Sequence, residues 1–373
     1  MNVSNARADK SQGYFSGSYK QNDCIFLMKC LGYASNYRFE TVADKEHLIQ
    51  SGARHYSEMA AKESAPSAAY LRLFETAIRD YKQLLAQHVV DLADSIAKRR
   101  DHQITIVSLA RAGTPIGVLL TRQLNRWGKD ARHYSVSIIR DRGMDEAAMR
   151  FIIEDEQRKP ESIVFVDGWT AKGVITRELK KAIDAFNERH QSYQLKNELF
   201  VISDIGETAD IAATKDDYLI PSGILNAVVS GLVSRSILER GANPRQFHGC
   251  IYYDTLQAHD MSRSFANRID GMAVNLRPRG VESVRDTHRG EDLKVELSCI
   301  QTEFNVSDIN RIKPGIAEST RVMLRRVPDR LLLRSMSDPD IQHLLMLAKE
   351  KSVGVTEKPQ MSFRALALIK DVL

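Results

Sequence analysis

The sequence of 373 residues has few long hydrophobic runs, no paired cysteine spacing and no internal repeat. Its apolar segments, such as Ile104–Ala110, are far shorter than the roughly 20 residues that a membrane-spanning helix needs, so we expect no membrane partner. Met1–Lys10 is polar and lacks the apolar core of a secretory signal. Four unpaired cysteines argue against a disulfide framework or a zinc ribbon. We therefore expect a cytoplasmic protein with reduced thiols.

The composition is that of an ordinary globular protein. The chain has 53 Lys and Arg against 48 Asp and Glu, and 43% of its residues are hydrophobic, which excludes wholesale disorder and fibrous architecture. At about 100–200 residues per domain, the length predicts about two domains.

From residue 103 onward, short apolar runs alternate with amphipathic segments. This alternation predicts an α/β fold with a parallel sheet and helices on both faces. The expected strands are 24–28, 104–109, 134–139, 163–166, 199–203 and 248–253. The expected helices are 70–78, 84–96, 116–124, 174–186 and 222–238.

The chain divides into four parts by composition. Residues 1–100 are expected to form a helical hood or dimer surface over the α/β domain of residues 101–272. Residues 273–302 are polar and are expected to be a linker with a short strand at 293–297. Residues 303–373 predict a small α/β domain with helices at 316–327 and 341–351 and a strand at 331–333.

The sharpest local signal is an apolar strand that leads through Asp167 into a short turn and then a helix. Such a turn leaves backbone N–H groups unpaired at the positive end of the helix, which suits an anion. Gly173 permits close backbone approach, Thr170 offers a hydroxyl and Lys172 adds positive charge. An ordinary strand-to-helix turn with a capping threonine explains this segment equally well when it is taken alone.

A second segment has the same layout. Arg111 and Gly113 lie between an apolar strand and a helix whose first turn contains Pro115. If the two strands are neighbours, both turns open at the carboxyl edge of the sheet, where α/β proteins bind ligands. The charged segment Arg140–Gly143 lies between them in sequence and is expected to close over a polyanion.

In order and spacing these segments resemble type I phosphoribosyltransferases. The resemblance implies that phosphoribosyl pyrophosphate, or a related nucleotide, is gripped by Arg111, Ala112, Gly113, Arg140, Arg142, Thr170, Ala171, Lys172, Gly173 and Val174. It also implies catalytic roles for Asp167 and Arg111, with Mg²⁺ held at Asp167. The sequence departs from that family at Gly168, which replaces a second acid. The resemblance therefore supports substrate binding better than turnover.

A basic segment lies near the C-terminus. Seven Lys and Arg residues but only two acids fall between Arg311 and Arg334, partly on an amphipathic helix. Charge alone is explained equally well by a solvated helix face.

The amino-acid sequence of this segment and of the residues that follow it resembles the Pelota-type RNA-binding domain, through Lys313–Arg321 and Ala348–Val353. The resemblance implies an RNA partner contacted by Lys313, Gly315, Glu318, Ser319, Arg321 and Arg325.

A chain that combines these two resemblances in this order resembles the StiP-type family, whose members are associated with tellurium-resistance stress genes. Together the resemblances imply a phosphoribosyltransferase-like protein in a stress-linked nucleoside or RNA pathway. One alternative is an RNA-binding regulator that senses a nucleotide without catalysis. Another is a cysteine protease, because members carry that label, but Cys24 and Cys250 lie in expected strands without a recognisable histidine partner.

Overall fold

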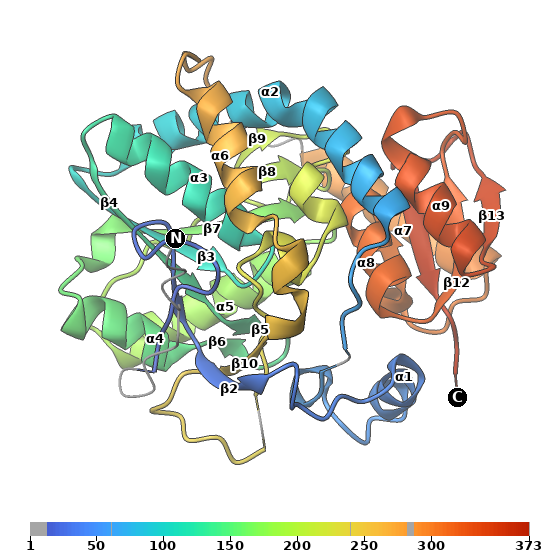
Figure 1. Ribbon diagram of the computed structural model, residues 1–373, viewed down its shortest axis with the longest axis horizontal. Helices are drawn as coiled ribbons and strands as arrows, with labels where there is room; N and C mark the ends of the chain where they lie inside the picture. The colour runs from blue at the N-terminus through green and yellow to red at the C-terminus, as the bar shows by residue number, and fades with distance from the viewer. Residues whose placement is uncertain (1–12, 61, 239, 282–286, 373) are drawn as a thin grey trace.

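The computed structural model describes residues 13–60, 62–238, 240–281 and 287–372 (Figure 1). A larger α/β body is followed by a smaller one at the C-terminus, coloured orange to red in Figure 1. The polar segment Met1–Lys10 and part of the expected linker, residues 282–286, lie outside the described residues.

The main sheet has six parallel strands in the order β1-β4-β3-β7-β8-β9. Their bounds are β1 (Ile25–Leu27), β3 (Gln103–Leu109), β4 (Asp130–Val136), β7 (Ile163–Thr170), β8 (Leu199–Asp204) and β9 (Ile211–Thr214). The middle strands are buried on both faces, which is why they read as continuous apolar runs. The expected parallel sheet is confirmed.

Helices cover both faces of this sheet. One face carries α2 (Ala68–Arg99), α3 (Gly113–Arg126) and α6 (Ser262–Ala273), and the other carries α4 (Glu146–Arg150) and α5 (Val174–Arg189). The segments expected as two helices, 70–78 and 84–96, form the single helix α2.

Two short strand pairs flank the main sheet. Strand β2 (Lys29–Tyr33) pairs in parallel with β10 (Gly249–Tyr252), so the expected strand 248–253 lies outside the main sheet. Strands β5 (Ile138–Ile139) and β6 (Gly143–Met144) form a small antiparallel pair.

The helix expected at 222–238 is wrong. This segment contains two short 3₁₀ turns, Pro221–Ile224 and Ala227–Val229, followed by irregular chain. Gly231 adopts a left-handed conformation with φ +79°, and a Cβ there would lie 2.9 Å from the ring of Phe26. The small residues of this segment therefore serve close packing in an irregular path, and their spacing imitates a helix.

The C-terminal body is a four-stranded sheet in the order β11-β14-β12-β13, with β11 (Ile312–Pro314), β12 (Pro328–Leu333), β13 (Gly354–Glu357) and β14 (Ala365–Ile369). Its helices are α7 (Thr287–Glu303), α8 (Ile316–Arg325) and α9 (Gln342–Glu350). The short strand expected at 293–297 is wrong, since Leu293, Leu297 and Ile300 recur at helical spacing in α7 and are buried.

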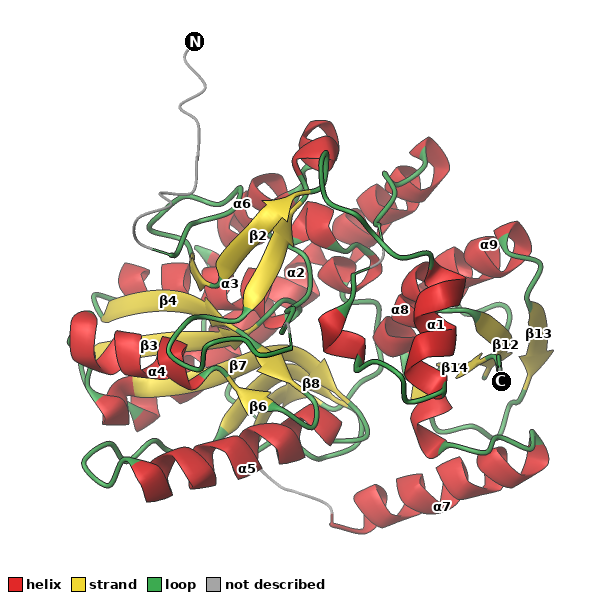
Figure 2. Cartoon of the chain, turned by 90° about the horizontal axis from the view of Figure 1, so that it is seen from below, coloured by secondary structure: helices red, strands yellow, loops and turns green. Residues whose placement is uncertain are grey.

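The N-terminal helix α1 (Val42–Gln50) packs against the C-terminal body (Figure 2). Glu46 receives two hydrogen bonds from Arg326, at 2.5 and 2.7 Å. Gln50 donates to the Lys370 carbonyl and accepts from the Val372 N–H. The two ends of the chain therefore build one surface together.

A second join lies at the other end of α8. The Asp217 carboxylate accepts the N–H groups of Ile316 and Arg364, at 2.9 and 3.0 Å. The expected domain boundaries and dimer surface stay predictions. Within the described ranges, no helix is both long and apolar enough to span a membrane.

Candidate functional site

The two glycine-containing turns meet at the carboxyl edge of the main sheet. A Cβ on Gly113 would lie 2.6 Å from the Val166 carbonyl oxygen, and one on Gly168 would lie 3.3 Å from the Ala112 carbonyl oxygen. Only glycine permits the first approach, because real Cβ atoms do not come so close to backbone. The turn at 111–113 is thus pressed against the turn that begins at Asp167.

The turn at 111–113 is closed. The buried Arg111 guanidinium forms an ion pair with Glu63 and donates to the Val233 carbonyl at 2.7 Å. The other Glu63 oxygen accepts the Ala227 N–H at 3.0 Å. Two of the three Arg111 nitrogens are thus engaged within the protein, whereas its buried Nε has no hydrogen-bond partner in the described structure. The expected role of Arg111 in gripping an anion stays a prediction. Ala112 and Gly113 pack against β7 and do not line the main cavity.

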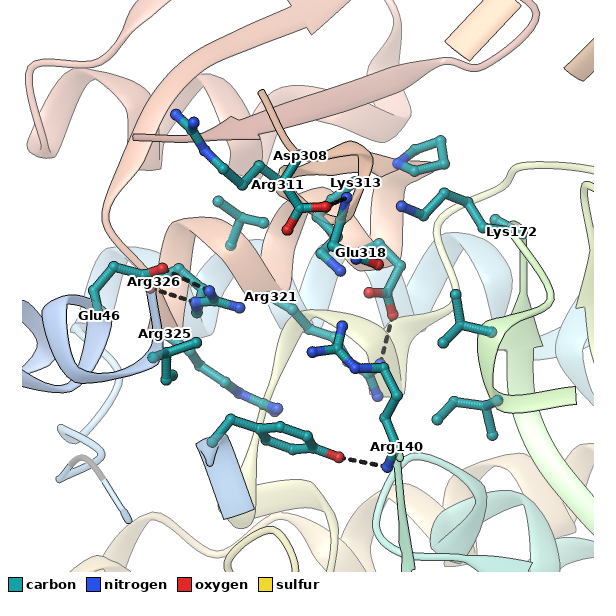
Figure 3. A pocket seen from close by; sticks show the side chains of 18 of the residues that line it. Glu46, Arg140, Lys172, Asp308, Arg311, Lys313, Glu318, Arg321, Arg325 and Arg326 are labelled. Carbon is teal, nitrogen blue, oxygen red and sulfur yellow. Dashed lines mark hydrogen bonds and ion pairs between the residues drawn. The ribbon is translucent and has the colours of Figure 1, made fainter. Parts of the chain in front are cut away.

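The other turn opens into a cavity of about 580 Å³ between the sheet edge, α1 and α8 (Figure 3). Asp167 and the whole run Thr170–Val174 line it, so the structure brings these predicted residues together. The lining includes five acids and nine cations, and the cations are Lys45, Arg140, Lys172, Arg235, Arg311, Lys313, Arg321, Arg325 and Arg326. This excess of positive charge on several converging elements favours an anionic ligand.

Asp167 is an unusual acid for this cavity. Burial raises its pKa to about 7, against the opposing charge of Arg321 and a hydrogen bond from the Gly168 N–H at 2.7 Å. A carboxyl group that is half protonated near neutral pH and ringed by cations does not suit a divalent metal. The described part of the chain contains no group of three metal-ligating His, Cys, Asp or Glu side chains. The surroundings of Asp167 therefore do not fit the expected Mg²⁺.

Trp169 of the larger body and Glu318 and Arg321 of the C-terminal body contact one another, and we call these three residues the stacked trio. The Arg321 guanidinium lies 4.7 Å from the centre of the Trp169 ring, and the Trp169 indole N–H donates to Glu318 at 3.3 Å. Arg321 also pairs with Glu318 at 2.5 Å. Burial alone raises the Glu318 pKa, but the charges of Arg321 and Lys313 and these hydrogen bonds bring it to about 2. Glu318 is therefore ionised at neutral pH.

Two lysines face each other across the mouth of the cavity (Figure 3). Lys172 donates to the Ile309 carbonyl at 2.8 Å, and burial together with the charge of Lys313 lowers its pKa to about 7. Burial likewise lowers the pKa of Lys313. Both ammonium groups would gain from an anion between them.

Some predicted site residues are engaged elsewhere. Arg142 pairs with Glu58 at 3.0 Å and does not line the cavity, whereas Arg140 does. Gly315, with φ +92°, is packed so that a Cβ would lie 2.7 Å from the Ile205 side chain.

Ser319 is also engaged within the protein. It is buried and donates to the Lys313 carbonyl at 3.2 Å. Both Gly315 and Ser319 are therefore buried against other parts of the protein, and the expected RNA contacts at these positions stay predictions.

Four cations and two aromatic residues of the cavity were not among the predicted site residues: Lys45, Arg235, Arg311, Arg326, Tyr56 and Trp169. Arg311 and Arg326 belong to the basic C-terminal segment, whose charge was noted. Trp169 lies inside the turn already singled out, so its position beside the anion loop was a usable signal. The others come from segments distant in sequence and carry no local motif.

The cysteines divide by exposure. Cys24 and Cys250 are fully buried, and burial raises the pKa of both thiols. Cys30 on β2 is half-buried and Cys299 on α7 is exposed. A thiolate nucleophile requires a lowered pKa and access, so neither buried thiol is suited to attack in this arrangement.

Comparisons with known proteins cover nearly the whole chain. A family described as "Tellurite-like stress resistance cysteine protease StiP" matches residues 17–270, and the "PELOTA RNA binding domain" matches residues 293–371. A protein named "Cysteine protease StiP" from Acinetobacter baylyi (strain ATCC 33305 / BD413 / ADP1) is 41% identical over 374 residues. The match covers 96% of this chain and 95% of the relative.

These findings correct one expectation and confirm others. The expected phosphoribosyl transfer is wrong, because the family and the relative are named for a cysteine protease and nothing supports a phosphoribosyltransferase. The expected Pelota domain and the link to stress resistance are confirmed. The chain belongs to the StiP family and carries a Pelota RNA-binding domain at its C-terminal end.

Proposed function

We propose that the protein binds single-stranded RNA in the cavity between the sheet edge and α8. The observation that carries this proposal is that cations from both matched regions converge on one cavity. Such cations supply the sequence-independent attraction for phosphates. A volume of about 580 Å³ falls in the usual range of small-ligand pockets, so it suits an unstacked nucleotide better than a duplex.

The stacked trio supports recognition of a base. A guanidinium that lies on an indole ring offers its second face for stacking, and the rigid trio holds that face in place. The ionised Glu318 is an acceptor for the amino group of a base. Arg325, one helical turn beyond Arg321 on α8, is placed to follow the phosphate backbone.

Arg321→Ala tests this proposal against the matched variant Arg79→Ala, which removes an exposed arginine of α2. With a short single-stranded RNA, we expect Arg321→Ala to weaken binding by roughly tenfold and to flatten the salt slope by about 0.7. Arg79→Ala should change neither quantity. Equal effects of the two substitutions, or no RNA binding by the unaltered protein at low salt, would contradict RNA binding in this cavity.

We further propose that the protein is a cysteine protease, as the names of its family and relative say of them. Of the two accessible cysteines in the described structure, Cys30 has the more suitable surroundings. Its strand pairs with β10, which begins one residue after the half-buried His248, and the Lys29 N–H donates to the His248 carbonyl at 2.9 Å. The Cys30 thiol and the His248 imidazole, whose Nδ1 lies 2.7 Å from the Ser137 hydroxyl, are the types of group that nucleophilic catalysis needs.

Hydrolysis of an unfolded protein substrate tests this second proposal. We expect Cys30→Ser to abolish hydrolysis, because a serine hydroxyl is a far weaker nucleophile than a thiolate. Cys299→Ser, the matched control at the exposed thiol, should retain full activity. Full activity of Cys30→Ser would contradict the assignment to Cys30, and inactive unaltered protein would contradict protease function on that substrate.

A further inference from the structure

Four cations gather at the end of the cavity beside α1. Lys45 comes from α1, Arg325 and Arg326 from the last turn and cap of α8, and Arg235 from the irregular chain ahead of β10. We call these four residues the cation cluster. Three of them, Lys45, Arg235 and Arg325, also line a small adjoining pocket next to the Arg111–Glu63 pair. Figure 3 shows Arg325 and Arg326 beside Glu46 at this end.

Few carboxylates pair directly with this cluster, although the charge of Glu63 acts on Arg325 and that of Glu46 acts on Lys45. In the described structure Arg326 alone of the four has a carboxylate partner, which is Glu46. Arg235 donates to the carbonyls of Tyr56 and Met59 and lies 5.1 Å from the centre of the Tyr56 ring.

Lys45 and Arg325 have still less compensation. Arg325 donates to the neutral amide of Asn226, and its buried Nε has no hydrogen-bond partner. Lys45 is 6% exposed, and within the described residues its ammonium makes no hydrogen bond or ion pair. Lys45 and Arg325 thus line the same two cavities without an ion pair to a carboxylate in the described structure.

Such an arrangement is unfavourable without an anion. A buried charge needs a partner of opposite sign, and leaving it without one destabilises the folded state. The pKa of Lys45 reflects this unfavourable environment: burial and the charges of Arg235 and Arg326 lower it to about 6. An anion placed among these cations would reverse that shift.

The number of cations selects the kind of anion. An internal phosphodiester carries one negative charge, whereas a phosphate monoester carries about 1.5 to 2 near pH 7 and has three acceptor oxygens. Three cations without carboxylate partners match the monoester better. Arginine forks bind such oxygens in pairs, and a lysine adds a point charge.

We propose that the cation cluster binds the terminal phosphate monoester of an RNA strand whose neighbouring nucleotide lies against Arg321 and Trp169. This inference rests on the proposed RNA binding and deepens it, since the cluster and the stacked trio line one continuous cavity. Arg321 and Arg325 are four residues apart on α8, about 6 Å along its axis, so one nucleotide spans the distance between them. The protein thereby distinguishes the end of a strand from its interior.

The first experiment compares short single-stranded RNAs of one sequence that carry a 5′-phosphate, a 3′-phosphate or hydroxyl groups at both ends. We expect one phosphorylated end to bind about tenfold tighter than the hydroxyl-ended strand, as an added charge-assisted contact would give. The preferred end identifies the strand polarity. Equal binding of all three strands would overturn the terminal-phosphate inference while RNA binding itself stands. No binding of any strand would overturn both.

A second experiment uses Lys45→Gln, with the exposed Lys181→Gln as the matched control. Removal of the Lys45 ammonium does not endanger folding, because no ion pair in the described structure depends on it, and Arg325→Gln provides a second variant. Both cluster variants should lose the tenfold preference, and Arg325→Gln should also weaken binding of the hydroxyl-ended strand, because Arg325 follows the phosphate backbone. Lys181→Gln should keep the preference and bind each strand as the unaltered protein does. A preference that survives in both cluster variants would overturn the assignment.

Proton uptake supplies a readout that a merely structural role would not move. At pH 7 Lys45 is mostly neutral, so a bound phosphate that restores its charge draws a proton from the buffer. Calorimetry in two buffers of different ionisation enthalpy should show net uptake with the phosphorylated strand, and none in Lys45→Gln. Equal proton exchange in the unaltered protein and in Lys45→Gln would contradict the role of Lys45.

Discussion

The two turns at the carboxyl edge of the main sheet, at 111–113 and 167–173, have the same local layout, but only the second one lines the main cavity. Each follows a buried parallel strand, contains glycine and leads into a helix. At the first turn Arg111 forms an ion pair with Glu63, whereas at the second turn Lys172 lines the cavity. The difference comes from a carboxylate nearly fifty residues away in the chain, so a strand–glycine–helix pattern indicates a turn but does not show whether its positive charge is available.

The strongest way to test this comparison is to remove the carboxylate that closes the first turn. Glu63→Ala leaves Arg111 buried without its counter-charge and the Ala227 N–H without its acceptor. We expect the free energy of unfolding to fall by about 3–5 kcal/mol, the usual effect of breaking a buried pair. Urea denaturation measures it.

The matched control is Glu40→Ala, which removes a half-exposed partner of Arg54. It should change the free energy of unfolding by no more than about 1 kcal/mol. Similar losses from both substitutions would show that Glu63 does not close the first turn.

The second turn contains a carboxyl group whose environment opposes ionisation. Because burial raises the folded-state pKa of Asp167 to about 7, the stability contributed by its neutral form is fully present below its unfolded pKa and is lost as pH rises through about 7. Asp167→Asn does not ionise. Its free energy of unfolding relative to the unaltered protein should therefore rise by about 2–3 kcal/mol between pH 5 and pH 8. Urea denaturation at both pH values measures this, and a difference that stays constant would contradict the environment described for Asp167.

RNA binding compares the two turns directly. Lys172→Ala removes a cation of the cavity and should weaken single-stranded RNA binding about fivefold and flatten the salt slope by about 0.7. Arg111→Met, measured where the variant is folded, should change RNA affinity by less than about twofold, because Arg111 does not line the main cavity. Fluorescence anisotropy across a salt series gives both values. A larger loss in Arg111→Met than in Lys172→Ala would invert the assignment.

The smallest expected effect concerns the indole of the second turn. Trp169→Phe keeps an aromatic ring beneath Arg321 but loses the hydrogen bond to Glu318, so RNA affinity should fall only about twofold. Intrinsic fluorescence sharpens the result, since Trp127 is the only other tryptophan and does not line the cavity. The fluorescence change on adding RNA should disappear in Trp169→Phe and persist in Trp127→Phe. The reverse would place the RNA elsewhere.

What could be predicted from the sequence was local. Strands β3, β7 and β8 and helices α5 and α8 follow from apolar runs and helical periodicity that neighbouring residues carry by themselves. The same reasoning failed at 222–238, where the path is set by tight packing of Gly231 on Phe26. It also treated α7 as a linker because polar residues outnumber its buried leucines.

Only those cavity residues that lie in local sequence motifs could be predicted. Asp167, Lys172 and Arg321 lie in recognisable motifs, and the structure brings them together. Lys45 lies beside them where Glu46 on α1 pairs with Arg326, 280 residues further along the chain, and Arg235 is held by the carbonyls of Tyr56 and Met59. A contact of that range has no local signature in a single sequence.

The clasp formed by Gln50 ties the first helix to the last described residues of the polypeptide. The Gln50 amide both accepts and donates a hydrogen bond there, so residues 370–372 hold α1, the helix that carries Lys45, in place. Removal of residues 370–372 would take away these contacts of Gln50 and also Asp371, which lines the cavity and pairs with Arg311. Residues 370–372 therefore support one wall of the proposed ligand cavity, and substitutions there would alter it.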